Sequence, residues 1–179
     1  MQHNHFEGSV VPFARRWHVI QEVDLVRLLS ANGRRAALCN RLEDLADSLP
    51  ELPGEEQVAA LCPELQEAIV RDARDELSYL DAMLRRQGDP LADVLLEHVR
   101  MRRSADVAGV QELVAALQPK EGETRLAPDA LGYLLRGFFS DCRRAIDYEQ
   151  LAILALAGHR LTPEAREMLI DAIAERAVG

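Results

Sequence analysis

Four long stretches of this chain carry apolar residues at steps of three and four, the spacing that places them on one face of an α-helix. These stripes run over residues 25–46, 65–83, 91–105 and 131–156. No stretch alternates apolar and polar residues over a useful length, so we expect no β-sheet. Four amphipathic helices joined by short links predict an all-α fold, an up-down-up-down four-helix bundle.

Proline and glycine mark where the predicted helices end. Pro50, Pro53 and Gly54 stop the first helix, and Gly88-Asp89-Pro90 combines a helix terminator, an N-cap and a first helical residue. Cys62-Pro63 predicts a kink or a restart within the second helix. We expect helices over about 15–48, 55–86, 90–117 and 127–158, and a short closing helix over about 163–176. Residues 1–12 read as an irregular lead-in, and the whole chain, 1–179, as one domain.

Composition excludes several classes of protein. The net charge of −9 and the scattered arginine pairs argue against nucleic-acid binding. The longest apolar run, residues 151–157, is too short to cross a membrane. Three cysteines without C-x-x-C spacing suit a reducing, cytoplasmic setting, and residues 1–9 lack an export pattern. We therefore expect a cytoplasmic protein with no nucleic-acid or membrane partner.

Polar residues interrupt the apolar stripes near the middle of each helix. Asp72 and Glu76 lie one turn apart on the second helix, and Glu149 lies on the fourth. On the third helix we place this stripe inward: Leu91, Leu95, His98, Met101 and Ala105. On the first, Asn32 takes the central position in Leu25, Leu29, Asn32, Ala36, Cys39, Leu42 and Ala46. Burying a carboxylate without a partner costs several kcal/mol, so these groups require a cation, a metal or a wet cavity.

The order of these residues resembles the hemerythrin-like (HHE cation-binding) domains. Short segments also resemble bacterial members of that family, over residues 37–47, 95–98, 152–157 and 160–163. The resemblance covers roughly residues 22–175. It implies a four-helix bundle that holds two irons. The expected ligands are a His on the first helix, His-x3-Glu on the second, a His on the third and a second His-x3-Glu on the fourth.

The chain departs from that ligand pattern as often as it matches it. The matching residues are Glu76, His98 and Glu149. Three positions that the family fills with histidine hold other residues here: Asn32, Asp72 and Ala145. Arg102 stands one turn after His98, where classical hemerythrins carry another histidine. Because imidazole ligands tune those irons for oxygen, the substitutions argue against reversible oxygen binding.

Two occupants of the centre remain open. In the first, the Arg102 guanidinium replaces the metal and neutralises Glu76 and Glu149, with Asp72 as a third candidate, through charge-assisted hydrogen bonds. In the second, one metal is retained, and its oxygen-rich ligand set would suit iron, manganese or magnesium. The residues that would hold it are Glu76, His98, Glu149, Asp72 and Asn32. A helix phase shifted by one position would instead turn the glutamates toward surface arginines.

The function we predict follows the first alternative. We expect a non-enzymatic sensory, regulatory or partner-binding module with an eroded di-iron site and no cofactor. The alternative is an iron-binding protein with an atypical site, acting in oxygen, iron or nitric oxide handling. The chain lacks the Glu-x-x-His motifs of ferritin-like carboxylate enzymes, so we do not expect an enzyme. A protein partner or a homodimer fits a helical bundle.

Overall fold

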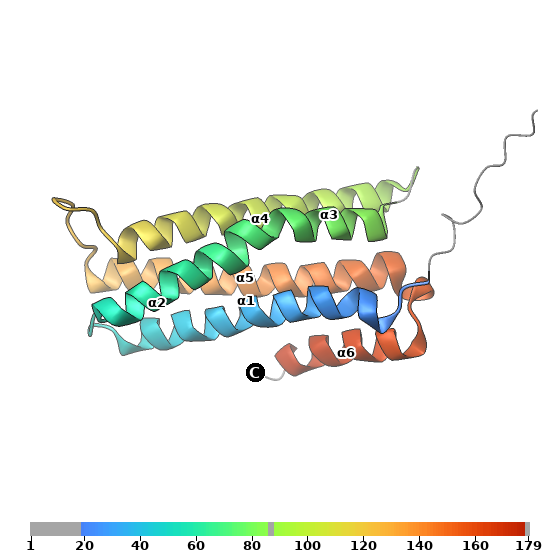
Figure 1. Cartoon of the computed structure of the whole chain (residues 1–179), viewed down its shortest axis with the longest axis horizontal. Coiled ribbons are helices and arrows are strands. Elements are labelled where there is room, and N and C mark those ends of the chain that lie inside the picture. Colours follow the sequence, from blue (N-terminus) through green and yellow to red (C-terminus); the bar gives the residue numbers. More distant parts are fainter. Residues whose placement is uncertain (1–18, 86–87, 178–179) are drawn as a thin grey trace, which may run out of the picture.

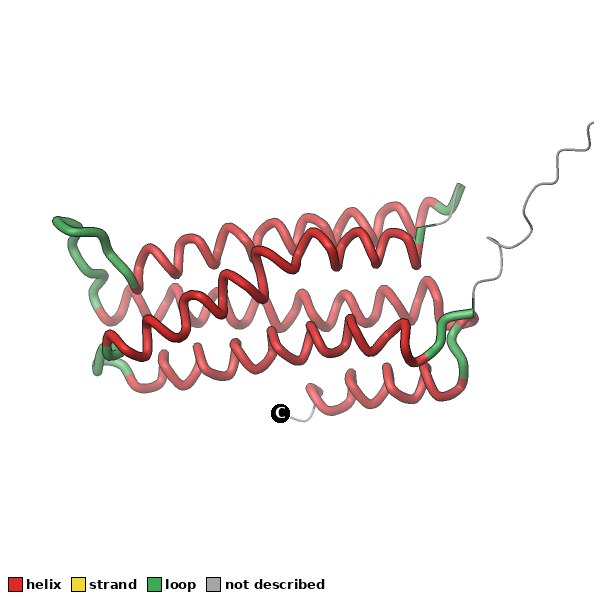
Figure 2. Tube along the Cα trace, viewed as in Figure 1, coloured by secondary structure: helices red, strands yellow, loops and turns green. Residues whose placement is uncertain are grey.

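The computed structural model describes residues 19–85 and 88–177, except the side chains of residues 72, 73, 176 and 177. Within that part the chain is helical and contains no strand, as predicted (Figures 1 and 2). The elements in chain order are α1 (Glu22–Ser48), α2 (Glu55–Leu65), η2 (Gln66–Arg71), α3 (Asp72–Leu84), α4 (Pro90–Leu117), α5 (Pro128–Ala157), η3 (Gly158–Arg160) and α6 (Pro163–Ala177). The predicted lead-in over residues 1–12 lies outside the described residues.

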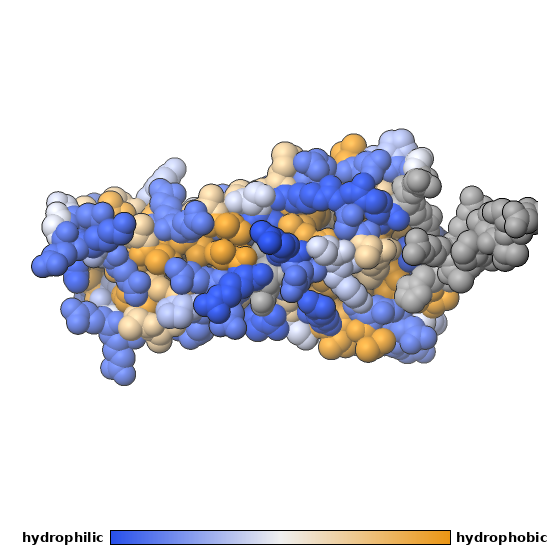
Figure 3. Space-filling model, turned by 45° about the horizontal axis from the view of Figure 1, so that its top comes forward, coloured by the Kyte–Doolittle hydropathy of each residue, from blue (hydrophilic) through white to orange (hydrophobic). Residues whose placement is uncertain are grey.

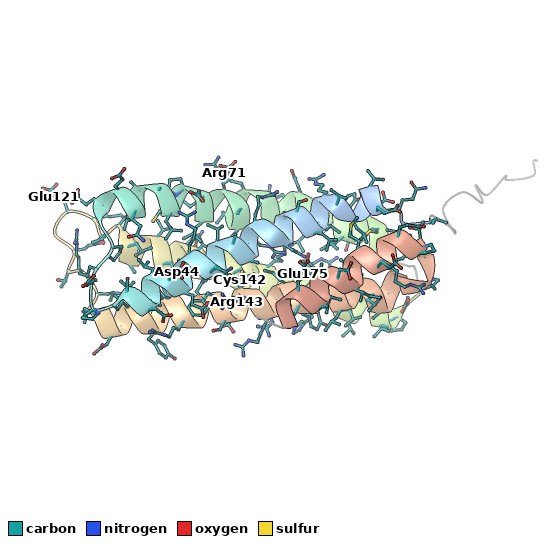
Figure 4. The ribbon with its side chains drawn as sticks, turned by 90° about the horizontal axis from the view of Figure 1, so that it is seen from below. Asp44, Arg71, Glu121, Cys142, Arg143 and Glu175 are labelled. Atoms are coloured by element: carbon teal, nitrogen blue, oxygen red, sulfur yellow. The ribbon has the colours of Figure 1, made fainter. Side chains whose placement is uncertain are left out.

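The long helices lie lengthwise beside one another, and each runs opposite to the one before it (Figure 1). The segments α2, η2 and α3 form one continuous rod between α1 and α4 in the sequence. Helix α5 packs against both α1 and α4. The short helix α6 folds back against α1 and α5 and reaches only to about the middle of the molecule, where Glu175 lies in Figure 4.

Local sequence explains where α4 begins, and backbone pairing with a distant segment explains where α1 begins. The Asp89 side chain accepts hydrogen bonds from the backbone N–H groups of Leu91 and Ala92, as expected of an N-cap. Gly88 has φ +78°, which suits a helix terminator. The prediction for α1 was wrong at its start: the helix begins at Glu22, not near residue 15. Ile20 instead pairs its backbone with residues 160 and 162, so it cannot be helical.

The second rod does not restart at Pro63, so the alternative of a new helix at that position was wrong. Helix α2 continues through Pro63, and the backbone then widens into the π-helix η2. Proline has no N–H to donate, and the N–H of Gln66 is shared between the carbonyls of Cys62 and Pro63. The rod changes direction there, and α3 then lies along α4 (Figure 1).

The interior consists of two apolar clusters at opposite ends of the molecule. The first apolar cluster is built around Leu42, Leu65, Leu113 and Leu135. The second is built around Leu28, Leu80, Leu96 and Ile153, and includes residues of α6. Helices α1, α4 and α5 and the rod from α2 to α3 contribute to both clusters, so each passes through the zone between them. Polar side chains occupy that zone.

The inward face of α4 differs from the predicted one by a single position. Leu91 and Met101 are more than half exposed, and Ala105 is exposed. The residues that α4 buries are Ala92, Leu96, Val99, Arg103, Asp106, Val110 and Leu113. The predicted stripe excluded Arg103 and Asp106. Both are buried here because charged side chains of other helices lie near them. The stripe predicted for α5 is correct, since all eight of its residues are buried: Leu131, Leu135, Phe138, Cys142, Ala145, Glu149, Ala152 and Leu156.

The stripe predicted for α1 is correct in most positions. Leu25, Asn32, Cys39, Leu42 and Ala46 are buried as expected, whereas Leu29 and Ala36 are only half-buried. Of the helices in the described part of the chain, none combines the length and the hydropathy that crossing a bilayer requires.

Candidate functional site

A buried layer of polar side chains separates the two apolar clusters. We call it the polar layer, and it consists of Asn32, Arg35, Glu76, Arg103, Asp106, Glu149 and Gln150. Helices α1, α3, α4 and α5 all contribute to it. Each of these residues follows the apolar residues of its own helix at steps of three or four, so the same helical faces bury leucines above and below and charges in the middle.

Arg103 links two glutamates from different helices at the centre of the layer. Its Nη1 donates to Oε2 of Glu76 at 2.6 Å, and its Nη2 and Nε donate to Oε2 of Glu149 at 2.8 and 3.1 Å. All three side chains are at least 96% buried. Burial acts to lower the pKa of Arg103, but the charges of Glu149 and Glu76 outweigh it and raise that pKa. The guanidinium therefore remains a cation between two carboxylates.

Arg35 supplies a second cation to Glu149. Its Nη2 lies 3.4 and 3.5 Å from the two carboxylate oxygens of Glu149, and it also donates to Oδ1 of Asn32. Burial acts to raise the pKa of Glu149, but Arg103 and Arg35 outweigh it and hold that pKa below its usual value. Two carboxylates and two guanidiniums thus compensate one another in the interior.

Asp106 differs from the two glutamates because it forms no hydrogen bond or ion pair with the described residues. Burial raises its pKa to about 6, although Arg35, Arg103 and Arg102 act to lower it. Among the described residues, Oδ2 of Asp106 finds no hydrogen-bond partner, and neither do Nε and Nη1 of Arg35. Burial thus brings the pKa of Asp106 close to neutral pH, whereas the pKa of Glu149 in the same layer is lowered.

A buried pair of thiols lies beside the polar layer. Cys39 and Cys142 are free and fully buried, and a hydrogen bond between them lowers the pKa of Cys39 and raises that of Cys142. In Figure 4, Cys142 lies near mid-length of α5, next to Arg143. Arg143 belongs to the surface network instead, since it donates to Glu43 at 2.6 Å and to Asn40 at 2.7 Å.

The structure brings together three of the residues predicted for the site. Glu76, Glu149 and Asn32 all lie in the polar layer. His98 forms no hydrogen bond or ion pair with them in the described part of the molecule: it is half-buried, and its ring contacts that of Tyr148, with centroids 4.2 Å apart and planes tilted by 49°. The side chain of Asp72, the fifth predicted ligand, lies outside the described residues.

The hypothesis that Arg102 neutralises the glutamates named the wrong arginine. Arg102 is half-buried, and its Nε donates to Nε2 of His98 at 3.5 Å. The cation that bridges Glu76 and Glu149 is its neighbour Arg103. The error follows from the one-residue shift in the inward face of α4, since neighbouring helical residues point about 100° apart.

Sequence reasoning missed Arg35, Arg103 and Asp106. A signal for the two residues of α4 was present, because Ala92, Leu96 and Val99 continue to Arg103 and Asp106 at regular helical steps. The same steps then reach Val110 and Leu113. The buried glutamates of other helices need a cation opposite them. That requirement would have selected the face of α4 that carries Arg103 over the face that carries Leu91 and Met101.

No group of three or more histidine, cysteine, aspartate or glutamate side chains is arranged to hold a metal ion in the part of the chain that the structure describes. The carboxylates of Glu76 and Glu149 are paired with the guanidinium groups of Arg103 and Arg35 instead. Comparison of the chain with family models, with curated proteins and with solved structures finds no match to any of them. The hemerythrin-like resemblance therefore remains a prediction.

Proposed function

We propose that this chain is a hemerythrin-like, up-down-up-down four-helix bundle that works without a metal, as a non-enzymatic regulatory, sensory or partner-binding module. The proposal rests on one observation: Arg103 bridges Glu76 and Glu149, the two carboxylates that match the family's ligand positions. A guanidinium keeps its proton at any physiological pH, so it is a permanent substitute for a metal cation.

Competition with these arginines disfavours metal binding. A metal ion would have to displace Arg103 and Arg35 from Glu149, and both side chains would then remain charged and nearly fully buried. An uncompensated buried cation costs several kcal/mol, so the metal must overcome that cost before it gains any affinity. We propose that these buried ion pairs also help to fix how the helices are aligned, because a shift in register would separate Arg103 from Glu76 and Glu149.

The central charges of the layer are engaged with one another in this proposal. Arg103, Glu76 and Glu149 neutralise one another, so in this proposal none of the three serves as a proton donor or acceptor. The three free, buried cysteines are compatible with the cytoplasmic location that we propose for the module.

Metal content tests the proposal directly. The protein is produced in iron-supplemented medium, purified without chelators, and its iron, manganese and zinc are measured together with the visible absorption spectrum. We expect far less than one metal per chain and no ligand-to-metal absorption band.

The controls for that experiment are three glutamate variants. Stoichiometric iron that disappears in Glu76→Gln and Glu149→Gln, but persists in the exposed control Glu64→Gln, would refute the proposal. That result would favour the alternative, an iron-binding protein with a carboxylate-rich site.

A further inference from the structure

Helix α4 carries a second apolar stripe that faces away from the interior. Leu91 is 56% exposed, Val94 65% and Met101 57%, which is unusual for three large apolar residues on one helix face. We call this face the outer stripe, and it consists of Leu91, Val94, His98, Met101, Ala105 and Ala108. Figure 3 shows scattered hydrophobic residues among mainly hydrophilic ones at the upper edge of the molecule. None of the residues of the outer stripe belongs to the face that α4 buries in the interior.

The spacing of the outer stripe is that of a coiled-coil seam. Its positions are separated by alternating steps of three and four, which repeat every seven residues. The stripe spans about 26 Å at the usual 1.5 Å rise per residue. On α5, the ring of Tyr148 contacts that of His98 at a tilt, and Leu151, which follows one turn later, is 52% exposed. The apolar surface therefore widens from α4 onto α5.

The charges beside the stripe select its partner. In the heptad that assigns Leu91 and His98 to position a, Glu97 takes position g and Arg102 takes position e. When two identical helices pair in parallel and in register, each g residue faces the e residue five positions later in the other helix. Glu97 of one copy would then face Arg102 of the other, and the same pair would form twice by symmetry.

We propose that the outer stripe is the contact surface of a parallel homodimer, in which α4 of one chain packs against α4 of a second copy. This inference deepens the partner-binding role proposed above and rests on it, since it names the partner. The present ion pair of Glu97 with Arg100 does not oppose it, because the Glu97 side chain is 64% exposed and can reorient at little cost. An antiparallel pair would instead bring like charges of the e and g positions together.

Sedimentation equilibrium of the full chain between about 1 and 100 μM tests the dimer. We expect the wild type to reach twice its 20.0 kDa mass, and Val94→Glu to stay at 20.0 kDa at every concentration. Val23→Glu is the matched control, because Val23 is also an exposed valine, at 71%, but lies on α1. Far-ultraviolet circular dichroism verifies that both variants are folded. A monomeric wild type, or equal dimerisation of Val94→Glu and Val23→Glu, overturns the proposal.

Charge exchange tests the orientation. Glu97→Arg and Arg102→Glu should each raise the dissociation constant at least about fivefold, since two pairs per dimer become repulsive. The double variant should recover the wild-type value. Single variants that dimerise normally overturn the parallel register. A monomeric protein that also lacks metal would refute the homodimer and leave the metal-free bundle standing, whereas a metal-loaded dimer would do the reverse.

Discussion

Replacing Arg103 with methionine isolates what the polar layer contributes to stability. Methionine has a similar length and no charge, so the change removes the cation while filling much of the same space. Glu76 would then lose the one hydrogen-bond partner that it has among the described residues, and Glu149 would lose Arg103 but keep Arg35 at 3.4 Å. Breaking a buried ion pair from one side costs about 3–5 kcal/mol. For a chain of this length, that lowers Tm by roughly 6–20 °C.

The matched control is Arg102→Met, one residue earlier on the same helix. Arg102 is half-buried, and the one hydrogen bond it makes within the described structure is to His98 at 3.5 Å. Its loss should change the free energy of unfolding by less than about 1 kcal/mol. Urea unfolding of both variants, followed by circular dichroism, gives the two values. Equal destabilisation by the two substitutions would refute the assignment of Arg103 as the bridging cation.

A double-mutant cycle with Glu76 then separates the ion pair from simple packing. In Glu76→Gln, Arg103 still has Glu149, so we expect a smaller loss than in Arg103→Met. In the double variant no carboxylate remains unpaired at Glu76, so its destabilisation should fall short of the sum of the two single losses by at least about 1 kcal/mol. Strict additivity would contradict a direct Glu76–Arg103 interaction.

Two further outcomes follow from single positions in the interior. Because burial raises the folded-state pKa of Asp106 from 3.8 to about 6, its contribution to stability is present below pH 3.8 and is lost as the pH rises through 6. Asp106→Asn should therefore stabilise the protein at pH 7 by up to ~3 kcal/mol, with a gain that shrinks toward pH 4, as measured by urea unfolding across that range. A Cβ on Gly109 would lie 2.7 Å from the Phe138 ring, whereas one on Gly137 meets nothing within 4 Å. Thermal melts should show Gly109→Ala destabilised, since overpacking of about 1–3 kcal/mol exceeds the helix-propensity gain, and Gly137→Ala stabilised by up to about 1 kcal/mol. The same sign for both glycine variants would contradict the close packing of α4 on α5.

Part of the candidate site could be read from the sequence because its carboxylates interrupt otherwise apolar stripes. Glu149 has buried apolar residues one turn before and one turn after it, so no other face of α5 was available. Glu76 was assigned for the same reason, from its place before Leu80 and Met83. Both are buried as predicted, and the need for a compensating cation followed from the cost of burying charge.

The bridging arginine could not be assigned because α4 is apolar on two sides. Leu91 and Met101 form one stripe and Leu96 and Val99 the other, and hydropathy alone slightly favours the face without an arginine. The choice between them depends on the electrostatic environment, which Glu76 and Glu149 provide from distant parts of the chain.

The sequence by itself determined that this chain is helical, where most of its helices begin and end, and that acidic groups lie on their inward faces. These properties depend on spacing, caps and prolines, which act over a few residues. Only the tertiary structure decided which face of α4 turns inward, that Arg103 and Arg35 meet Glu149, and that His98 stays at the edge. The reason is that the free energy of burying a charge depends on its partners on other helices. The rotation of those helices depends on contacts between distant segments, which the local sequence does not specify.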